Sequence, residues 1–242
     1  AGGASGLMAA CPNATLLAHP RAARHLIDPA KLVASAKHVY GEARFTELYG
    51  VIAPIPEARV RVMEDGATFT LGDATLTAWH TSGHAFHHLV VDDPATDAVF
   101  TGDTFGLVYP ALQAHGRFAL PSTSPTGFEA VEARKSLDKV LSLGRRSVCP
   151  THYGEARDVH RIADQVRRFV ELSEQWVAQA AATAAPLSEL TGTIQARLRE
   201  ALDTAARRVG LSLGPSDWAA LELDVTLNAQ GLAFVADKRR AG

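Results

Sequence analysis

Three short segments of the sequence each place a possible metal ligand directly after a run of residues typical of a β-strand. Side chains at strand ends are held by a rigid sheet and yet face a cleft, as a metal site requires. Imidazole and carboxylate ligands together suit zinc, iron or manganese. The three candidate ligands are His84 in segment 81–88, Asp103 in segment 100–104 and His152 in segment 150–154.

Each of these residues also has an ordinary structural explanation when it is taken alone. A glycine precedes both His84 and Asp103, so both could be simple turn residues, and His152 could be a surface histidine. His84 and His88 have the i, i+4 spacing of zinc ligands on a helix. The Ser-Gly pair before His84 and the flanking strands argue against a helix, so we interpret this segment as a turn.

The elements expected around the three segments are short strands between residues 60 and 101 and helices after residue 127. Short β-rich runs separated by tight turns extend from Val60 to Thr101, and they favour adjacent strands over alternating strands and helices. The segment 110–125, rich in Pro, Ser and Thr, is expected to be a long loop. The other expected elements are helices at 1–10, 20–26, 29–40 and 127–143, strands at 14–18 and 147–149, and an extended connection at 50–57.

After residue 158 the composition becomes rich in Ala, Arg, Glu, Gln and Leu, which predicts helices interrupted at Pro186. The tail, residues 217–238, fits strand alternation and a helical stripe equally well, and we favour the helix. These helices are expected to pack back on the domain, with a dimerisation element or a lid as alternatives. Their apolar stripes comprise Leu172, Trp176, Leu187, Leu190, Ile194 and Leu198.

Composition excludes several classes of protein. The 242 residues include 24 Lys and Arg against 26 Asp and Glu, so the basic excess that nucleic-acid binding requires is absent. No apolar run approaches the length of a membrane span, and no secretory signal is visible. We therefore expect a cytoplasmic protein that acts on a small molecule, with no nucleic-acid or membrane partner. Cys11 and Cys149 are expected to be reduced.

In order and spacing, the segments 82–88, 101–103 and 151–152 resemble the later metal motifs of the metallo-β-lactamase superfamily. The first of these motifs is usually Gly-His-Thr followed two residues later by Gly-His. This chain keeps both histidines, as His84 and His88, and has Ala85 and His87 in the other places. The resemblance implies an αββα sandwich over residues 1–158, followed by a helical C-terminal extension over residues 159–242.

The resemblance also implies two divalent metal ions, most often zinc, with iron or manganese as alternatives. His84 would bind the first metal, His152 the second, and Asp103 would bridge them and could accept a proton from water. His88 would orient the turn that carries the ligands. Loop 118–128 would lie over the site. Three further residues close to the ligands in sequence are candidate substrate contacts or simply packed loop residues, namely Tyr109, His115 and Tyr153.

The family's first motif, His-x-His-x-Asp-His, supplies four further ligands and does not occur in this sequence. In the family, Ala-Gly-Gly commonly follows it, and this chain opens with Ala1-Gly2-Gly3. We therefore expect the chain to begin just after that motif and to lack the first strands of the sandwich. The alternative, a mature protein that lacks those strands, is less expected, because its sheet would expose an edge with unpaired backbone N–H and C=O groups. With three of seven ligands, we expect the chain as given to bind metal weakly and to be inactive.

The resemblance implies a hydrolase whose dinuclear site delivers hydroxide to an ester, thioester, lactone or phosphoester. Aspartate at the bridging position is similar to glyoxalase-type thioesterases, lactonases and phosphodiesterases, whereas β-lactamases proper usually carry cysteine there. We therefore do not expect β-lactam hydrolysis. Two alternatives stay open: an iron-dependent oxidoreductase of the persulfide dioxygenase or flavodiiron kind, and a non-catalytic fragment with an incomplete site. A homodimer is also compatible with the sequence.

Overall fold

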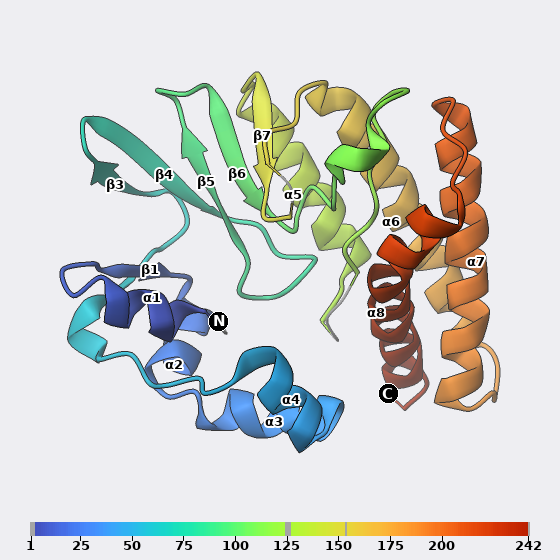
Figure 1. Ribbon diagram of the computed structural model, residues 1–242, viewed down its shortest axis with the longest axis horizontal. Coiled ribbons are helices and arrows are strands. Elements are labelled where there is room, and N and C mark those ends of the chain that lie inside the picture. Colours follow the sequence, from blue (N-terminus) through green and yellow to red (C-terminus); the bar gives the residue numbers. More distant parts are fainter. Residues whose placement is uncertain (1–2, 124–126, 153, 242) are drawn as a thin grey trace. The chain divides into compact units, whose positions relative to one another are not determined.

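A computed structural model describes residues 3–123, 127–152 and 154–241 of the chain (Figure 1). The chain forms two compact units, residues 1–67 and residues 68–242. All of the candidate ligands belong to the second unit. Among the described residues, no helix has the length and apolar character needed to cross a membrane. Both cysteines are free thiols, as expected.

The first unit consists of four short helices and a parallel pair of strands. Arg59 ties its parts together, because its guanidinium donates hydrogen bonds to the carbonyl oxygens of Met8, Cys11 and Ala14. The parallel pair is β1 (Leu16–Ala18) and β2 (Val60–Val62). The helices are α1 (Ala4–Ala10), α2 (Pro20–Ile27), α3 (Ala30–Tyr40) and α4 (Glu42–Tyr49), and a 3₁₀ turn at Glu57–Arg59 precedes β2.

Helix α4 was missing from the elements expected from the sequence. Gly41 and Gly50 flank it, and both have positive φ angles, 76° and 59°, which glycine adopts without strain. Phe45 is the buried anchor of this helix. A segment of eight residues with one buried side chain shows too little apolar periodicity to predict a helix from sequence.

The second unit contains a five-stranded sheet with the order β3-β4-β5-β6-β7. Strands β4, β5 and β6 are neighbours in the sheet, as the run of adjacent strands in the sequence predicts. They are antiparallel, whereas β6 and β7 are parallel. Helix α5 (Ala130–Ser142) provides the crossover that a parallel pair requires. The strands are β3 (Ala67–Leu71), β4 (Ala74–His80), β5 (Leu89–Asp93), β6 (Ala98–Gly102) and β7 (Ser147–Pro150).

Three long helices complete the second unit: α6 (Val159–Ala181), α7 (Leu187–Arg208) and α8 (Pro215–Ala241). The tail is therefore helical, and the strand interpretation of that segment is wrong. Leu221, Val225 and Leu232 of α8 are fully buried at helical spacing.

The predicted stripes of the C-terminal helices mostly face the interior. Leu190, Ile194 and Leu198 of α7 are buried, while Leu187 is 43% exposed. Leu190, Ile194 and Leu198 belong to one continuous core cluster that also includes Val90 of the sheet. The expectation that the helices pack back on the domain is confirmed, whereas the predicted domain boundary at residue 158 stays a prediction.

Candidate metal centre

Sheet topology brings the ligand-bearing segments to one edge. Strands β4, β6 and β7 point in the same direction, because β5 runs antiparallel to both β4 and β6 and because β6 and β7 are parallel. Their C-terminal ends therefore meet at one edge of the sheet. His84 lies in the turn after β4, Asp103 directly after β6, and His152 two residues after β7.

The Asp103 carboxylate lies between the two histidines. Its Oδ2 is 3.7 Å from Nε2 of His84, and its Oδ1 is 3.4 Å from Nε2 of His152. Each histidine thus faces a different oxygen of the same carboxylate. The surroundings differ as well, since the side chain of His84 is 14% exposed and that of His152 is 48% exposed.

Ser122 fixes the orientation of the His84 ring. Nδ1 of His84 lies 3.2 Å from the Ser122 carbonyl oxygen and 3.1 Å from its hydroxyl. A carbonyl oxygen only accepts hydrogen bonds, so this network assigns the proton of a neutral His84 to Nδ1. Nε2 then presents a lone pair to Oδ2 of Asp103. Two acceptors that face each other in this way are stabilised by a cation placed between them.

His88 lies beneath the Asp103 loop. Its Nε2 accepts a hydrogen bond from the backbone N–H of Asp103 at 3.0 Å, and its Nδ1 lies 2.7 Å from Oγ1 of Thr81. Burial lowers the pKa of His88 to about 4, and the neighbouring His84 acts in the same direction while Asp103 opposes it. A neutral ring with its proton on Nδ1 satisfies both contacts and holds the Asp103 backbone in place.

Gly102 makes this approach possible. Its φ is +52°, and a Cβ at this position would lie 2.3 Å from Nε2 of His88. A side chain would therefore collide with the ring that supports Asp103. The glycine of the Gly-Asp pair is needed for close packing as well as for the turn.

Helix α5 anchors the turn that carries His84. The Ser136 hydroxyl donates to the Ser82 carbonyl oxygen, and the Glu129 backbone N–H donates to the Gly83 carbonyl oxygen at 2.8 Å. At Gly83, with φ +125°, a Cβ would lie 2.3 Å from the Ala133 backbone nitrogen. The turn and the first turns of α5 are consequently in direct contact.

Helix α8 anchors the loop that carries Ser122. Asn228, which is only 3% exposed, accepts hydrogen bonds from the backbone N–H and the hydroxyl of Thr123 through its side-chain oxygen. Its own amide donates to the Asp224 carbonyl oxygen at 2.8 Å. Neither Ser122 nor Asn228 was predicted from the sequence as part of the site. The one available signal was a polar residue within the apolar stripe of α8.

The donor chemistry fits a divalent cation, but the number of donors is small. Two tetrahedral zinc ligands at about 2.1 Å from the metal lie about 3.4 Å apart, close to the two separations at Asp103. Yet no group of three or more His, Cys, Asp or Glu side chains among the described residues could hold a metal ion. Asp103 together with either histidine therefore offers two donor side chains, fewer than the four ligands of a structural zinc site.

A cavity of about 10 Å³ adjoins Asp103. This volume has room for about one water-sized group and none for an organic substrate. His84, Asp103 and Ser122 line it, and Val166 and Val170 of α6 close it. Access to Asp103 for a larger molecule is therefore on the more exposed side, where His152 lies.

Tyr109 and His115, two of the candidate substrate contacts, do not line the cavity at Asp103. The Tyr109 hydroxyl donates to the carboxylate of Asp224 on α8, and Tyr109 does not line the cavity at Asp103. His115 is exposed and lines a separate cavity between α6 and α7. Tyr153 lies outside the described residues. The structure thus brings together His84, Asp103, His152 and His88 but not Tyr109 or His115.

Comparisons with known proteins agree with this fold. Residues 1–152 match the family model described as the metallo-beta-lactamase superfamily, and this chain belongs to that superfamily. The structural neighbours include other members of it. A search of curated proteins found no match.

Three solved structures illustrate the likeness. An archaeal superfamily protein from Sulfolobus tokodaii is 20% identical with a TM-score of 0.62, over 94% of this chain and 73% of its own. A metallo-beta-lactamase family protein from Thermus thermophilus is 16% identical with a TM-score of 0.47, over 94% of this chain and 67% of its own. A protein solved in a di-iron-bound form is 25% identical with a TM-score of 0.43, over 69% of this chain and 70% of its own. Of these three, the Sulfolobus protein alone has a TM-score above 0.5, and it supports the fold.

Proposed function

We propose that this chain carries part of the dinuclear metal centre of a hydrolase that cleaves an ester, thioester, lactone or phosphoester. The observation that supports the proposal is the Asp103 carboxylate, with His84 at one oxygen and His152 at the other. Membership of the superfamily is compatible with this chemistry. The family's metals are divalent, and zinc, iron and manganese all accept imidazole and carboxylate ligands.

His84, Asp103 and His152 are the residues that would hold the cations. When bound, such ions would supply Lewis acidity and make water acidic enough to react near neutral pH. Asp103 would accept a proton from water. Ser122 keeps the lone pair of His84 directed at Asp103, and His88 holds the Asp103 backbone.

The two sides of the Asp103 carboxylate differ in their exposure to solvent. On the His84 side, the small cavity is lined by Ser122 and by Val166 and Val170 of α6, and the His84 side chain is only 14% exposed. The His152 side is half exposed, so the substrate approaches from it. A carboxyl or phosphoryl group of the substrate would then lie next to His152.

Hydrolysis assays test the proposal. A longer version of the protein, in which a segment with the family's His-x-His-x-Asp-His motif precedes Ala1, is loaded with zinc, manganese or ferrous iron and offered an ester, a thioester, a lactone and a phosphodiester. The chain as given should turn over none of them. His84→Ala and His152→Ala should lower metal-dependent kcat/KM at least about 100-fold, since even partners outside the ligand sphere cost about 10–100-fold.

His160→Ala is the matched control, because His160 is exposed on α6 and does not line the cavity at Asp103. It should leave the rate unchanged. No turnover of any substrate class by the longer version with any of the three metals would contradict the proposed hydrolase. Equal rates in the His84, His152 and His160 variants would contradict the assignment of the ligands.

A further inference from the structure

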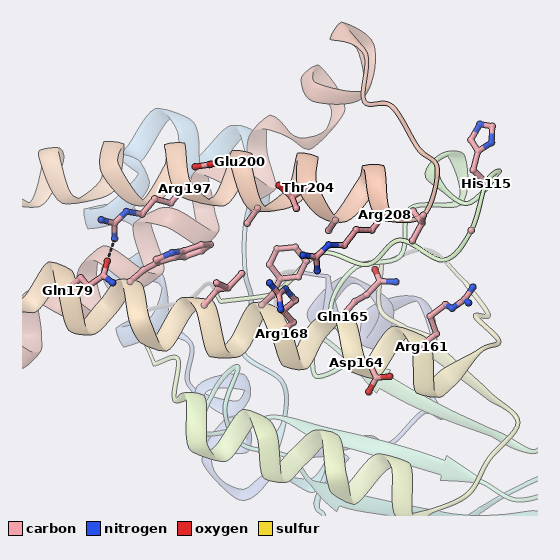
Figure 2. A pocket seen from close by; sticks show the side chains of 17 residues that line it. His115, Arg161, Asp164, Gln165, Arg168, Gln179, Arg197, Glu200, Thr204 and Arg208 are labelled. Atoms are coloured by element: carbon pink, nitrogen blue, oxygen red, sulfur yellow. Dashed lines mark hydrogen bonds between the residues drawn. The ribbon is translucent and has the colours of Figure 1, made fainter.

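A second cavity of about 810 Å³ lies between α6 and α7 (Figure 2). This volume is within the range of pockets that bind small organic molecules. None of its lining residues lines the cavity at Asp103. Helix α6 directs Val166 and Val170 toward Asp103 and directs Phe169 and Leu172 into this groove. The groove is therefore a separate candidate site.

The middle of the groove is apolar. Phe169, Leu172 and Trp176 line it from α6, and small residues, Ala201 and Ala205, line it from α7. Because alanines leave space between two helices that would otherwise interlock, an open slot remains above the aromatic side chains. Such a slot gains free energy when an apolar chain fills it, by about 25 cal/mol for each Å² of apolar surface buried.

The two ends of the groove differ. At the end near the α6–α7 connection, Nη1 of Arg197 donates to Oε1 of Gln179 at 2.6 Å, and this bond joins the two helices (Figure 2). Farther from this bridge lie Arg168 and Arg208, and Arg161 and the exposed His115 lie at the opposite end (Figure 2). The groove is thus bridged at one end and cationic at the other.

The arginines at the cationic end are available for a ligand. Arg161, Arg168 and Arg208 form no hydrogen bond or ion pair with any residue in the part of the chain that the structure describes. In Figure 2, Arg168 and Arg208 point toward each other across the groove. The acidic lining residues, Asp164 and Glu200, point away from it in the same view.

We propose that this groove binds an amphiphile with one long apolar chain and an anionic phosphate or carboxylate head. The head lies between Arg168 and Arg208, whose planar guanidinium groups pair with two oxygens of such an anion. The chain lies on Phe169, Leu172 and Trp176 toward the bridge formed by Gln179. From Arg168 to Gln179 the helix rises about 16 Å, which is long enough for an extended acyl chain.

Titration with dodecyl phosphate tests the proposal on the metal-free protein, below the concentration at which the amphiphile forms micelles. Trp176 lines the groove, so its fluorescence should change on binding, and Trp176→Phe should remove that change. The double variant Arg168→Gln/Arg208→Gln should weaken binding at least about tenfold, because two charge-assisted hydrogen-bonding groups are lost.

Arg207→Gln is the matched control, since Arg207 neighbours Arg208 but pairs with Asp203 at 2.7 Å. It should bind dodecyl phosphate as the parent protein does. Ala205→Trp should abolish binding by filling the groove, with circular dichroism confirming that the helices are retained. Dodecanoate should bind at the same site, and inorganic phosphate alone should bind far more weakly.

Several outcomes would overturn the proposal. One is the absence of binding up to the micelle concentration. Another is equal binding of the cationic dodecyltrimethylammonium, or equal affinity in the arginine double variant. A third is a dimer in sedimentation velocity that Ala205→Trp dissociates, because the groove would then be an interface between two copies of this chain.

Discussion

At the residue scale, a tight steric constraint on the candidate site lies between Gly102 and His88. Gly102→Ala places a methyl group within 2.3 Å of the His88 ring and also adopts a positive φ. We expect this variant to lose about 1–2 kcal/mol of stability from the backbone conformation alone, plus the cost of displacing His88. Chemical denaturation measures the loss.

Gly144→Ala separates the two contributions. Gly144 has a similar φ of +67°, but no atom lies within 4 Å of the added Cβ. It should therefore show the conformational cost without the collision. If the two variants are equally destabilised, the close packing of His88 against Gly102 is wrong.

His88 itself is expected to act through the backbone of Asp103. His88→Phe keeps the ring volume but removes the acceptor for the Asp103 N–H, and an unsatisfied buried donor costs about 1–3 kcal/mol. Metal affinity should fall with stability, and His88→Gln should restore part of both because its amide oxygen can accept. A Phe variant with unchanged stability and metal affinity would show that this hydrogen bond is unimportant.

Some residues of the candidate site can be predicted from a local sequence pattern, and others cannot. His84, Asp103 and His152 follow strands in an order and spacing that resemble the family's motifs, so the local pattern suffices to propose them as ligands. Ser122 contacts His84 across 38 positions in the chain. No local pattern encodes that contact, because it depends on how the loop folds over the sheet edge.

At the element scale, helix α8 positions the Ser122 loop through Asn228. Asn228→Ala should destabilise the protein by about 1–3 kcal/mol, because the buried N–H of Thr123 loses its acceptor. It should also weaken metal binding, because Ser122 no longer orients His84. Thermal unfolding and metal titration measure the two effects.

Gln230→Ala is the control on the same helix, since Gln230 is exposed. It should match the parent protein in both measurements. Loss of stability in Asn228→Ala without any change in metal affinity would restrict Asn228 to a structural role.

The prediction of elements succeeded where apolar periodicity is strong. The strands from β4 to β7 and helices α5, α6 and α7 agree with the sequence analysis to within a few residues. For α8, alternation and helical spacing coexist in the sequence, and burial of Leu221, Val225 and Leu232 on one face decided between them. The parallel pairing of β6 and β7 depends on α5 crossing between them, a feature that adjacency of runs does not predict.

At the scale of the whole second unit, sheet and C-terminal helices share one core. Leu137 of α5 and Leu202 of α7 are both fully buried in the same cluster. Leu137→Ala and Leu202→Ala should each cost about 2–5 kcal/mol and should lower the midpoint of one common unfolding transition. Calorimetry of the full chain measures both.

This experiment also tests the domain boundary that the family resemblance implies at residue 158. If Leu202→Ala lowers a transition of the helices and leaves that of the sheet unchanged, residues 159–242 form a separate domain. A shared shift would instead place the helices within the cooperative unit of the sheet. The amino-acid composition changes near residue 158. The core cluster nevertheless contains buried side chains from both sides of this position.

At the centre of the proposed site, Asp103 would be shared between two metal positions. Titration of the metal-free protein with Co²⁺, followed by absorption and calorimetry, tests it most directly. His84→Ala should remove one binding step, His152→Ala should remove the other, and Asp103→Asn should weaken both, while His160→Ala should match the parent protein. Asp103→Asn with both steps intact, or with only one affected, would contradict the bridging role.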